Sequence, residues 1–123
     1  MIRIAFIIFV VLHGLIHLMG FVKAFNFAEI SELNLPISKF MGIVWLSACL
    51  MFLGAMIQFY LEQDYWWLTS IIAIVLSQGL IFFSWQDAKF GTIANVIILI
   101  ITVLTLSGII ANETSFAGAD SAN

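Results

Sequence analysis

Apolar residues fill the chain in four long runs, and the charged residues fall between these runs. Residues 4–22, 40–61, 65–86 and 90–112 contain no Asp, Glu, Lys or Arg. Each run exceeds the roughly 18 residues that mark a membrane-spanning helix, because ~20 residues at ~1.5 Å rise cover a ~30 Å hydrocarbon core. The pattern therefore predicts an all-α membrane protein, with four antiparallel transmembrane helices that form a compact bundle.

The polar residues between the runs set the expected boundaries. We expect helices over residues 3–25, 39–61, 65–85 and 92–111. The joint at residues 62–64 is so short that the helices on either side of it must be antiparallel neighbours. Residues 1–111 then form a single transmembrane domain, and residues 112–123 form a small polar tail.

Composition narrows the function classes. The chain is 63% hydrophobic and only 9% charged, with a mean hydropathy of +1.17, whereas a soluble domain carries roughly 25% charged residues. The net charge is −3 and the basic residues are dispersed, so nucleic acid is not an expected partner. The expected partners are the lipid bilayer and either other membrane subunits or further copies of this chain in a homo-oligomer.

The basic residues at the helix ends predict an orientation. Lys23, Lys39 and Lys89 belong to the first and third loops, while Arg3 is on the opposite side with the second loop. Cytoplasmic loops carry the excess of Lys and Arg. We therefore expect a multi-pass protein of the bacterial inner membrane, with the three lysines in the cytoplasm and both termini in the periplasm.

Two histidines in the first run are the most informative polar residues. His13 and His17 lie four residues apart, so they share one face of a helix with Gly20. Ionisable side chains are expensive in lipid and should face the interior. Three interpretations stay open: neutral imidazoles that bond to neighbouring helices, a proton-linked or small-molecule site, and a metal or haem site.

The sequence contains no pattern typical of catalysis. No nucleophile stands beside a base at a recognisable spacing, and no paired carboxylates lie inside the runs, so we predict no catalytic residue. Two imidazoles supply fewer ligands than the three or four of a zinc site, and both lie on one face of one helix, which prevents bis-histidine haem ligation within one subunit. We predict no metal site and no cofactor. A redox or proton-handling component that holds haem, a metal or a quinone at His13 and His17 is the alternative.

Depth along the helices brings other polar side chains to the level of the histidines. Counted at ~1.5 Å per residue from the face shared by the first and third loops, His17 and Ser47 lie about 12 Å deep. By the same count Gln78 lies about 10 Å deep and Asn95 about 5 Å deep. We expect these four residues and His13 to line an intramembrane pocket that opens towards the third loop. The favoured function is non-enzymatic: an accessory or structural subunit, or a module that binds a lipid or another small ligand.

Two segments resemble a known group of proteins. Residues 13–25 read HGLIHLMGFVKAF and residues 84–95 read SWQDAKFGTIAN. Both segments resemble bacterial four-helix integral membrane proteins of unknown function, some of which continue into a soluble domain of unknown function. The resemblance implies that the histidine face and the turn with Trp85, Asp87 and Lys89 are signatures of the group, and it implies no activity. By its chemistry, Asp87 is expected to accept from the amides that open the last helix or to pair with a lysine.

Overall fold

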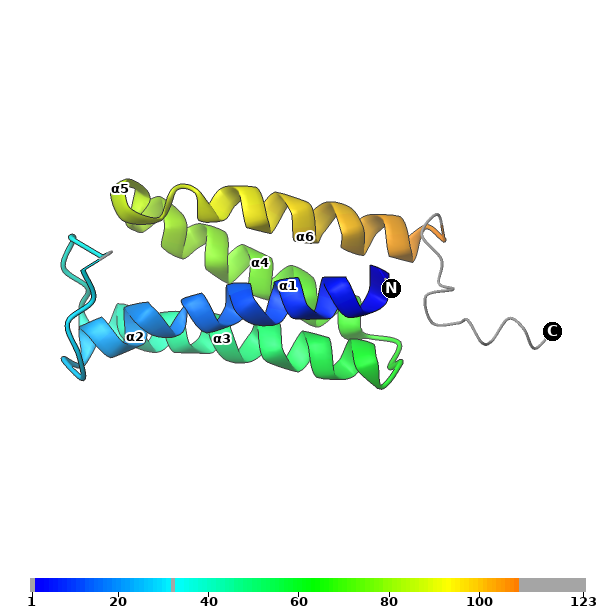
Figure 1. Ribbon diagram of the computed structural model, residues 1–123, viewed down its shortest axis with the longest axis horizontal. Coiled ribbons are helices and arrows are strands. Elements are labelled where there is room, and N and C mark those ends of the chain that lie inside the picture. The colour runs from blue at the N-terminus through cyan, green and yellow to red at the C-terminus, as the bar shows by residue number, and fades with distance from the viewer. Residues whose placement is uncertain (1, 32, 109–123) are drawn as a thin grey trace.

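The computed structural model describes residues 2–31 and 33–108, and over these residues the protein is helical without any strand. The helices are α1 (Ile2–Ile16), α2 (Leu18–Ala24), α3 (Lys39–Tyr60), α4 (Trp66–Phe83), α5 (Trp85–Ala88) and α6 (Gly91–Leu106). Figure 1 shows α1 and α2 as one nearly continuous rod beside α3. The predicted all-α class is confirmed.

Within residues 2–31 and 33–108, three segments are long and apolar enough to cross a membrane. They are Ile2–Ala24, which joins α1 and α2, Lys39–Tyr60 and Trp66–Phe83. Helix α6 is apolar but has 16 residues, which cover about 24 Å at the rise of an α-helix. The expected continuation of this helix to residue 111 lies outside the described residues, so the fourth span stays a prediction.

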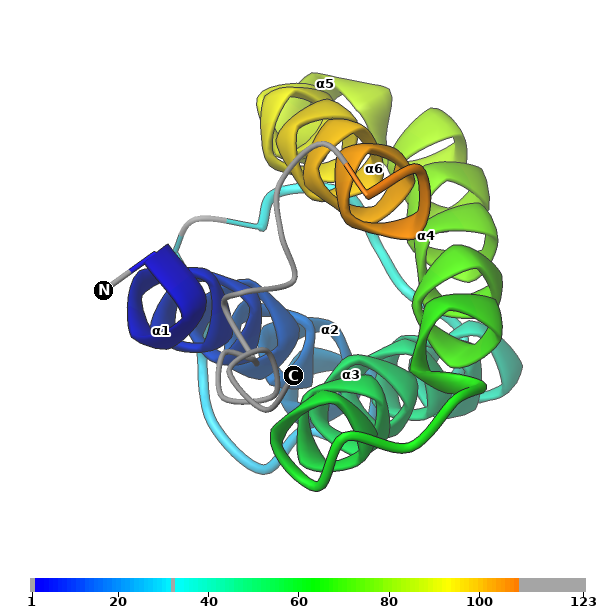
Figure 2. The ribbon, with the colours of Figure 1, turned by 90° about the vertical axis from the view of Figure 1, so that its right-hand side faces the viewer.

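The helices pack in chain order. Helix α3 lies between α1 with α2 on one side and α4 on the other, and α4 packs against α6. Figure 2 shows these neighbours around the long axis of the molecule. Among the described residues, α1 and α6 are not in extended backbone contact. The polar side chains of His13 and Asn95 meet between α1 and α6.

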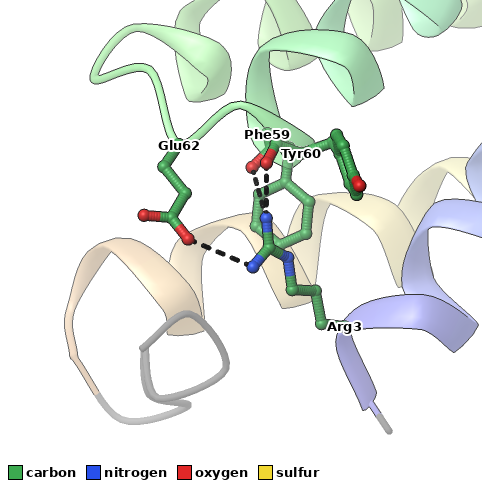
Figure 3. A network of polar contacts seen from close by, with 4 residues as sticks. All are labelled: Arg3, Phe59, Tyr60 and Glu62. Atoms are coloured by element: carbon green, nitrogen blue, oxygen red, sulfur yellow. Dashed lines mark hydrogen bonds and ion pairs between the residues drawn. The ribbon is translucent and has the colours of Figure 1, made fainter. Parts of the chain in front are cut away.

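Arg3 fastens the start of α1 to the end of α3. Its guanidinium donates to the carbonyl oxygens of Phe59 and Tyr60, at 3.3 and 2.6 Å, and to the carboxylate of Glu62 at 3.2 Å (Figure 3). The last carbonyls of a helix have no partner within it and carry the negative end of its dipole, so a cation is a suitable partner.

Glycine allows α2 and α3 to approach closely. A Cβ atom at Gly42 would stand 2.3 Å from the Cβ of Ala24, and a Cβ at Gly20 would stand 2.1 Å from the ring of Trp45. Real side chains do not tolerate such distances. The close approach of α2 to α3 therefore requires glycine at both positions.

We predict that Gly42→Ala destabilises the protein by about 1–3 kcal/mol, because overpacking displaces α2 from α3. The matched control is Gly54→Ala in the same helix. Apart from its chain neighbours and the adjacent backbone of its own helix, no atom lies within 4 Å of the position of a Cβ there. This control should be neutral or gain up to about 1 kcal/mol from helix propensity. Thermal unfolding in detergent measures both, and equal stability of the two variants would contradict the close approach.

Candidate functional site

The first long helix is interrupted at His17, and the side chain of this residue is the cause. Its Nδ1 atom lies 2.9 Å from the carbonyl oxygen of His13, which is the usual acceptor for the His17 amide. The His17 amide bonds instead to the carbonyl oxygen of Gly14, at 3.0 Å. The shorter hydrogen bond, from residue 17 to residue 14, tightens one turn and separates α1 from α2.

A chain of buried polar groups starts at His17 and crosses three helices. The Nε2 atom of His17 lies 2.8 Å from the hydroxyl of Ser77 on α4. That hydroxyl also lies 3.0 Å from Nδ2 of Asn95 on α6. The Oδ1 atom of Asn95 lies 2.9 Å from Nε2 of His13, so the chain returns to α1. All four side chains are at most 7% exposed.

A second branch extends the network towards the start of α6. The Nδ2 atom of Asn95 donates to Oε1 of Gln78 at 2.9 Å, and Nε2 of Gln78 donates to the hydroxyl of Thr92 at 2.9 Å. Within this network, helices α4 and α6 are thus joined both through Ser77 and through Gln78. Polar groups buried among apolar helices are costly unless they are paired, and this arrangement pairs them.

Aromatic rings enclose the two imidazoles. The ring of His17 lies 5.5 Å from that of Trp45 and 5.4 Å from that of Phe52, measured between centroids. The ring of His13 lies 5.1 Å from Phe52 and meets the ring of His17 edge-on at 4.9 Å. These contacts hold both imidazoles in fixed orientations against α3.

A cavity of about 500 Å³ adjoins the imidazoles, between α1 with α2 on one side and α5 with α6 on the other. Its lining comprises His13, Ile16, His17, Met19, Leu33, Trp45, Ile81, Asp87, Ala88, Phe90, Gly91 and Ala94. The size is within the ~300–1,000 Å³ of small-molecule sites. Ile16 is 53% exposed and Phe90 is 74% exposed, so the cavity reaches the surface of the protein beside these two residues.

A short segment of the first loop lies at the edge of the cavity and is tied to both sides. The Nζ atom of Lys23 donates to the carbonyl oxygen of Leu33. The carboxylate of Asp87 accepts from the backbone amides of Asn34 and Leu35, at 2.8 and 2.7 Å. This contact corrects the expectation for Asp87, because the carboxylate neither caps the last helix nor pairs with a lysine among the described residues.

Ser47, which the sequence predicts in the site, has a different place in the structure. Ser47 is outside the network: its hydroxyl donates to the carbonyl oxygen of Ile43 in its own helix, at 2.9 Å, and Ser47 does not line the cavity. The expectation that Ser47 joins the histidines is therefore wrong. Gln78 and Asn95 belong to the polar network but do not line the cavity, so the expectation that they line the pocket is wrong as well.

Two residues of the third loop contact aromatic rings. Trp85 stacks on Phe82 with 5.9 Å between ring centroids, and the Nζ atom of Lys89 lies 5.5 Å from the ring centroid of Phe90. Neither Trp85 nor Lys89 lines the cavity.

The sequence analysis missed Ser77, which takes the place expected for Ser47. Its signal is a spacing of seven between Ser70, Ser77 and Ser84, since residues seven apart lie on the same helical face. All three are buried, and Ser70 bonds to Thr102 on α6 at 3.3 Å. Ser70 and Ser77 thus form a small polar stripe on α4 that faces α6.

Among the described residues, no group of three or more His, Cys, Asp or Glu side chains is placed to hold a metal ion. Comparison with protein-family models, with curated proteins and with solved structures found no match for this chain.

We predict that Ser77→Ala lowers the stability of the protein by about 1–2 kcal/mol, because His17 and Asn95 each lose a buried partner. Ser47→Ala is the matched control. Its hydroxyl bonds only within its own helix, so its loss should change the stability by less than about 0.5 kcal/mol. Thermal or denaturant unfolding in detergent measures the stability of both variants. If Ser47→Ala lowers the stability as much as Ser77→Ala does, the role assigned to Ser77 in the network is refuted.

Proposed function

We propose that this protein is a non-enzymatic integral protein of the bacterial inner membrane that binds a small amphiphilic ligand in the cavity between α1 and α6. The observation that carries the proposal is the character of this cavity. It has two buried imidazoles on its wall and exposed apolar side chains where it reaches the surface. A polar end and an apolar opening match a ligand with a polar head and an apolar chain.

The surface supports placement in a membrane. Large apolar side chains are exposed on every long helix, among them Ile8 and Leu12 on α1, Leu50 on α3 and Val75 on α4. In lipid these residues meet acyl chains. We propose that α6 is the fourth span of a four-helix bundle, since its exposed residues are also apolar while Asn95 and Thr102 are buried.

Charge supports the proposed orientation. Arg3 lies at the end of the molecule where α3 finishes and bonds to Glu62 there. Lys23, Lys39 and Lys89 belong to the segments at the opposite end, where α2 finishes and α3 and α6 begin. An excess of Lys and Arg favours the cytoplasmic side, so this end is proposed to face the cytoplasm.

The bonding of His17 supports a binding role over metal or haem ligation by both histidines. Both ring nitrogens of His17 are already engaged, one by a backbone carbonyl and one by Ser77. Iron or zinc at His17 would have to displace one of these partners. The resemblance to bacterial four-helix membrane proteins, and assembly with other membrane subunits, are compatible with this role and are part of the proposal.

The binding proposal predicts that lipid-sized molecules co-purify with the protein. Ala94 lines the cavity but has no part in the polar network, so Ala94→Phe should fill the cavity and remove the bound molecule. Ala5→Phe, on the exposed side of α1, is the matched control. Native mass spectrometry from a mild detergent should show an adduct on the wild type and on the control alone. An adduct that survives in Ala94→Phe, or none on the wild type, would contradict the proposal.

The membrane proposal has a separate test. The protein should stay in membranes during alkaline carbonate extraction and leave them only with detergent. A reporter that is active only in the periplasm should work when fused to the C-terminus, and one that is active only in the cytoplasm should not. The reverse reporter pattern would overturn the orientation without affecting the cavity.

A further inference from the structure

We propose that the ligand of the cavity is an uncharged lipid whose head group carries a hydroxyl, and that this hydroxyl donates a hydrogen bond to Nδ1 of His13. The inference rests on the proposed function and specifies the ligand of the same site. Each hydrogen bond in the network has one possible donor and one possible acceptor, and together these assignments leave Nδ1 of His13 without a donor.

The direction is set at His17. Its Nδ1 atom faces the carbonyl oxygen of His13, and a carbonyl only accepts, so Nδ1 must carry the hydrogen. A neutral imidazole has one N–H, and a charged imidazolium is costly at this depth in an apolar helix. The Nε2 atom of His17 is therefore an acceptor, and it receives the hydrogen of the Ser77 hydroxyl.

Asn95 has to continue the same direction. The hydroxyl of Ser77 has given its only hydrogen to His17, so its oxygen accepts from Nδ2 of Asn95. Gln78 supports this orientation independently, because it donates through Nε2 to Thr92 and thus offers Oε1 to Asn95. The Oδ1 atom of Asn95 is left facing His13 and can only accept.

These bonds determine which ring nitrogen of His13 carries the hydrogen. Its Nε2 atom must carry the hydrogen that Asn95 accepts, so a neutral His13 has a bare lone pair on Nδ1. No donor to this nitrogen occurs in the described part of the chain, although His13 is only 7% exposed and lines the cavity. The adjacent Cε1 atom faces Gly91, another lining residue, at 3.9 Å from the position of a Cβ there. A ligand in the cavity can supply the missing donor.

The rest of the lining selects an uncharged lipid. Apart from the histidines, the only ionisable side chain in the lining is Asp87, and both of its oxygens are occupied by Asn34 and Leu35. An anionic head group would lie near this carboxylate with no cation among the described lining residues, and a cationic head group would have to break the bonds that hold Asn34 and Leu35 in order to pair with Asp87. Either change costs more than burial of a hydroxyl. The apolar chain can leave past Ile16 and Phe90, where the cavity reaches the surface.

The experiment compares 1-dodecanol with its methyl ether, which has the same chain but no hydroxyl hydrogen, in phosphatidylcholine nanodiscs. Nitrogen NMR of the labelled imidazoles should show His13 Nδ1 without hydrogen in the free protein. Dodecanol should shift this resonance and bind about 10-fold more tightly than the ether, the size of one neutral hydrogen bond. The NMR measurement uses the wild type, so it does not depend on the folding of any variant.

Variants locate the effect. His13→Leu has no nitrogen or oxygen that could accept from the ligand, so its preference for the alcohol should fall to about 1-fold. Ser47→Ala should keep the preference of the wild type. A monoacylglycerol and a short-chain quinol, each tested against its non-donor counterpart (the dimethyl ether and the quinone), distinguish a glycerolipid source from a quinol source.

The outcomes separate the two proposals. Equal binding of alcohol and ether, or a free His13 with its hydrogen on Nδ1, overturns the inference and leaves the ligand-binding function standing. Tighter binding of dodecylammonium than of dodecanol overturns the uncharged head group. If neither the probes nor any co-purified lipid binds, the proposed function fails together with the inference.

Discussion

The hydrogen bond between the imidazole of His17 and the carbonyl oxygen of His13 is the constraint on which the polar interior depends. It takes that carbonyl out of the helix ladder, so the His17 amide bonds to Gly14 and the first long helix divides into α1 and α2. It also places the hydrogen on Nδ1 of His17, which leaves the other ring nitrogen as an acceptor. Because each later group must complement the one before it, a bond within one helical turn sets the donors and acceptors on α4 and α6.

An apolar core joins α1, α3, α4 and α6, and two further kinds of contact join particular pairs of helices in different places. Helices α2 and α3 meet through glycine, where Gly42 faces Ala24 and Gly20 faces Trp45 too closely for any Cβ. Helices α1 and α6 meet through the bond between His13 and Asn95. Glycine contacts leave no free volume, whereas a pair of polar side chains holds two backbones apart. The cavity lies on the side of the molecule where polar bonds take the place of close packing.

The first loop completes this side of the molecule. Lys23 and Asp87 hold the backbone of residues 33–35 between the end of α2 and the start of α5, and Leu33 is thereby placed in the wall of the cavity. The cavity is thus bounded by a loop as well as by helices. The bonds of Asp87 go to two backbone amides and to the side chain of Asn34, so what this carboxylate contributes is the position of the loop.

The sequence alone determined the helical class, because runs without charge at spanning length leave few other structures. It also predicted depths of about 5–12 Å for His17, Ser47, Gln78 and Asn95, since depth follows from the number of residues along a helix. It did not indicate that the first helix divides at His17 or that α5 forms a separate short helix. Only the tertiary structure decided that Ser77 and not Ser47 completes the network, and that Asp87 binds the first loop. The angle at which a helix turns towards its neighbours depends on how all the helices pack, and the path of a loop depends on which backbone amides it brings within reach. Neither quantity can be counted along the chain.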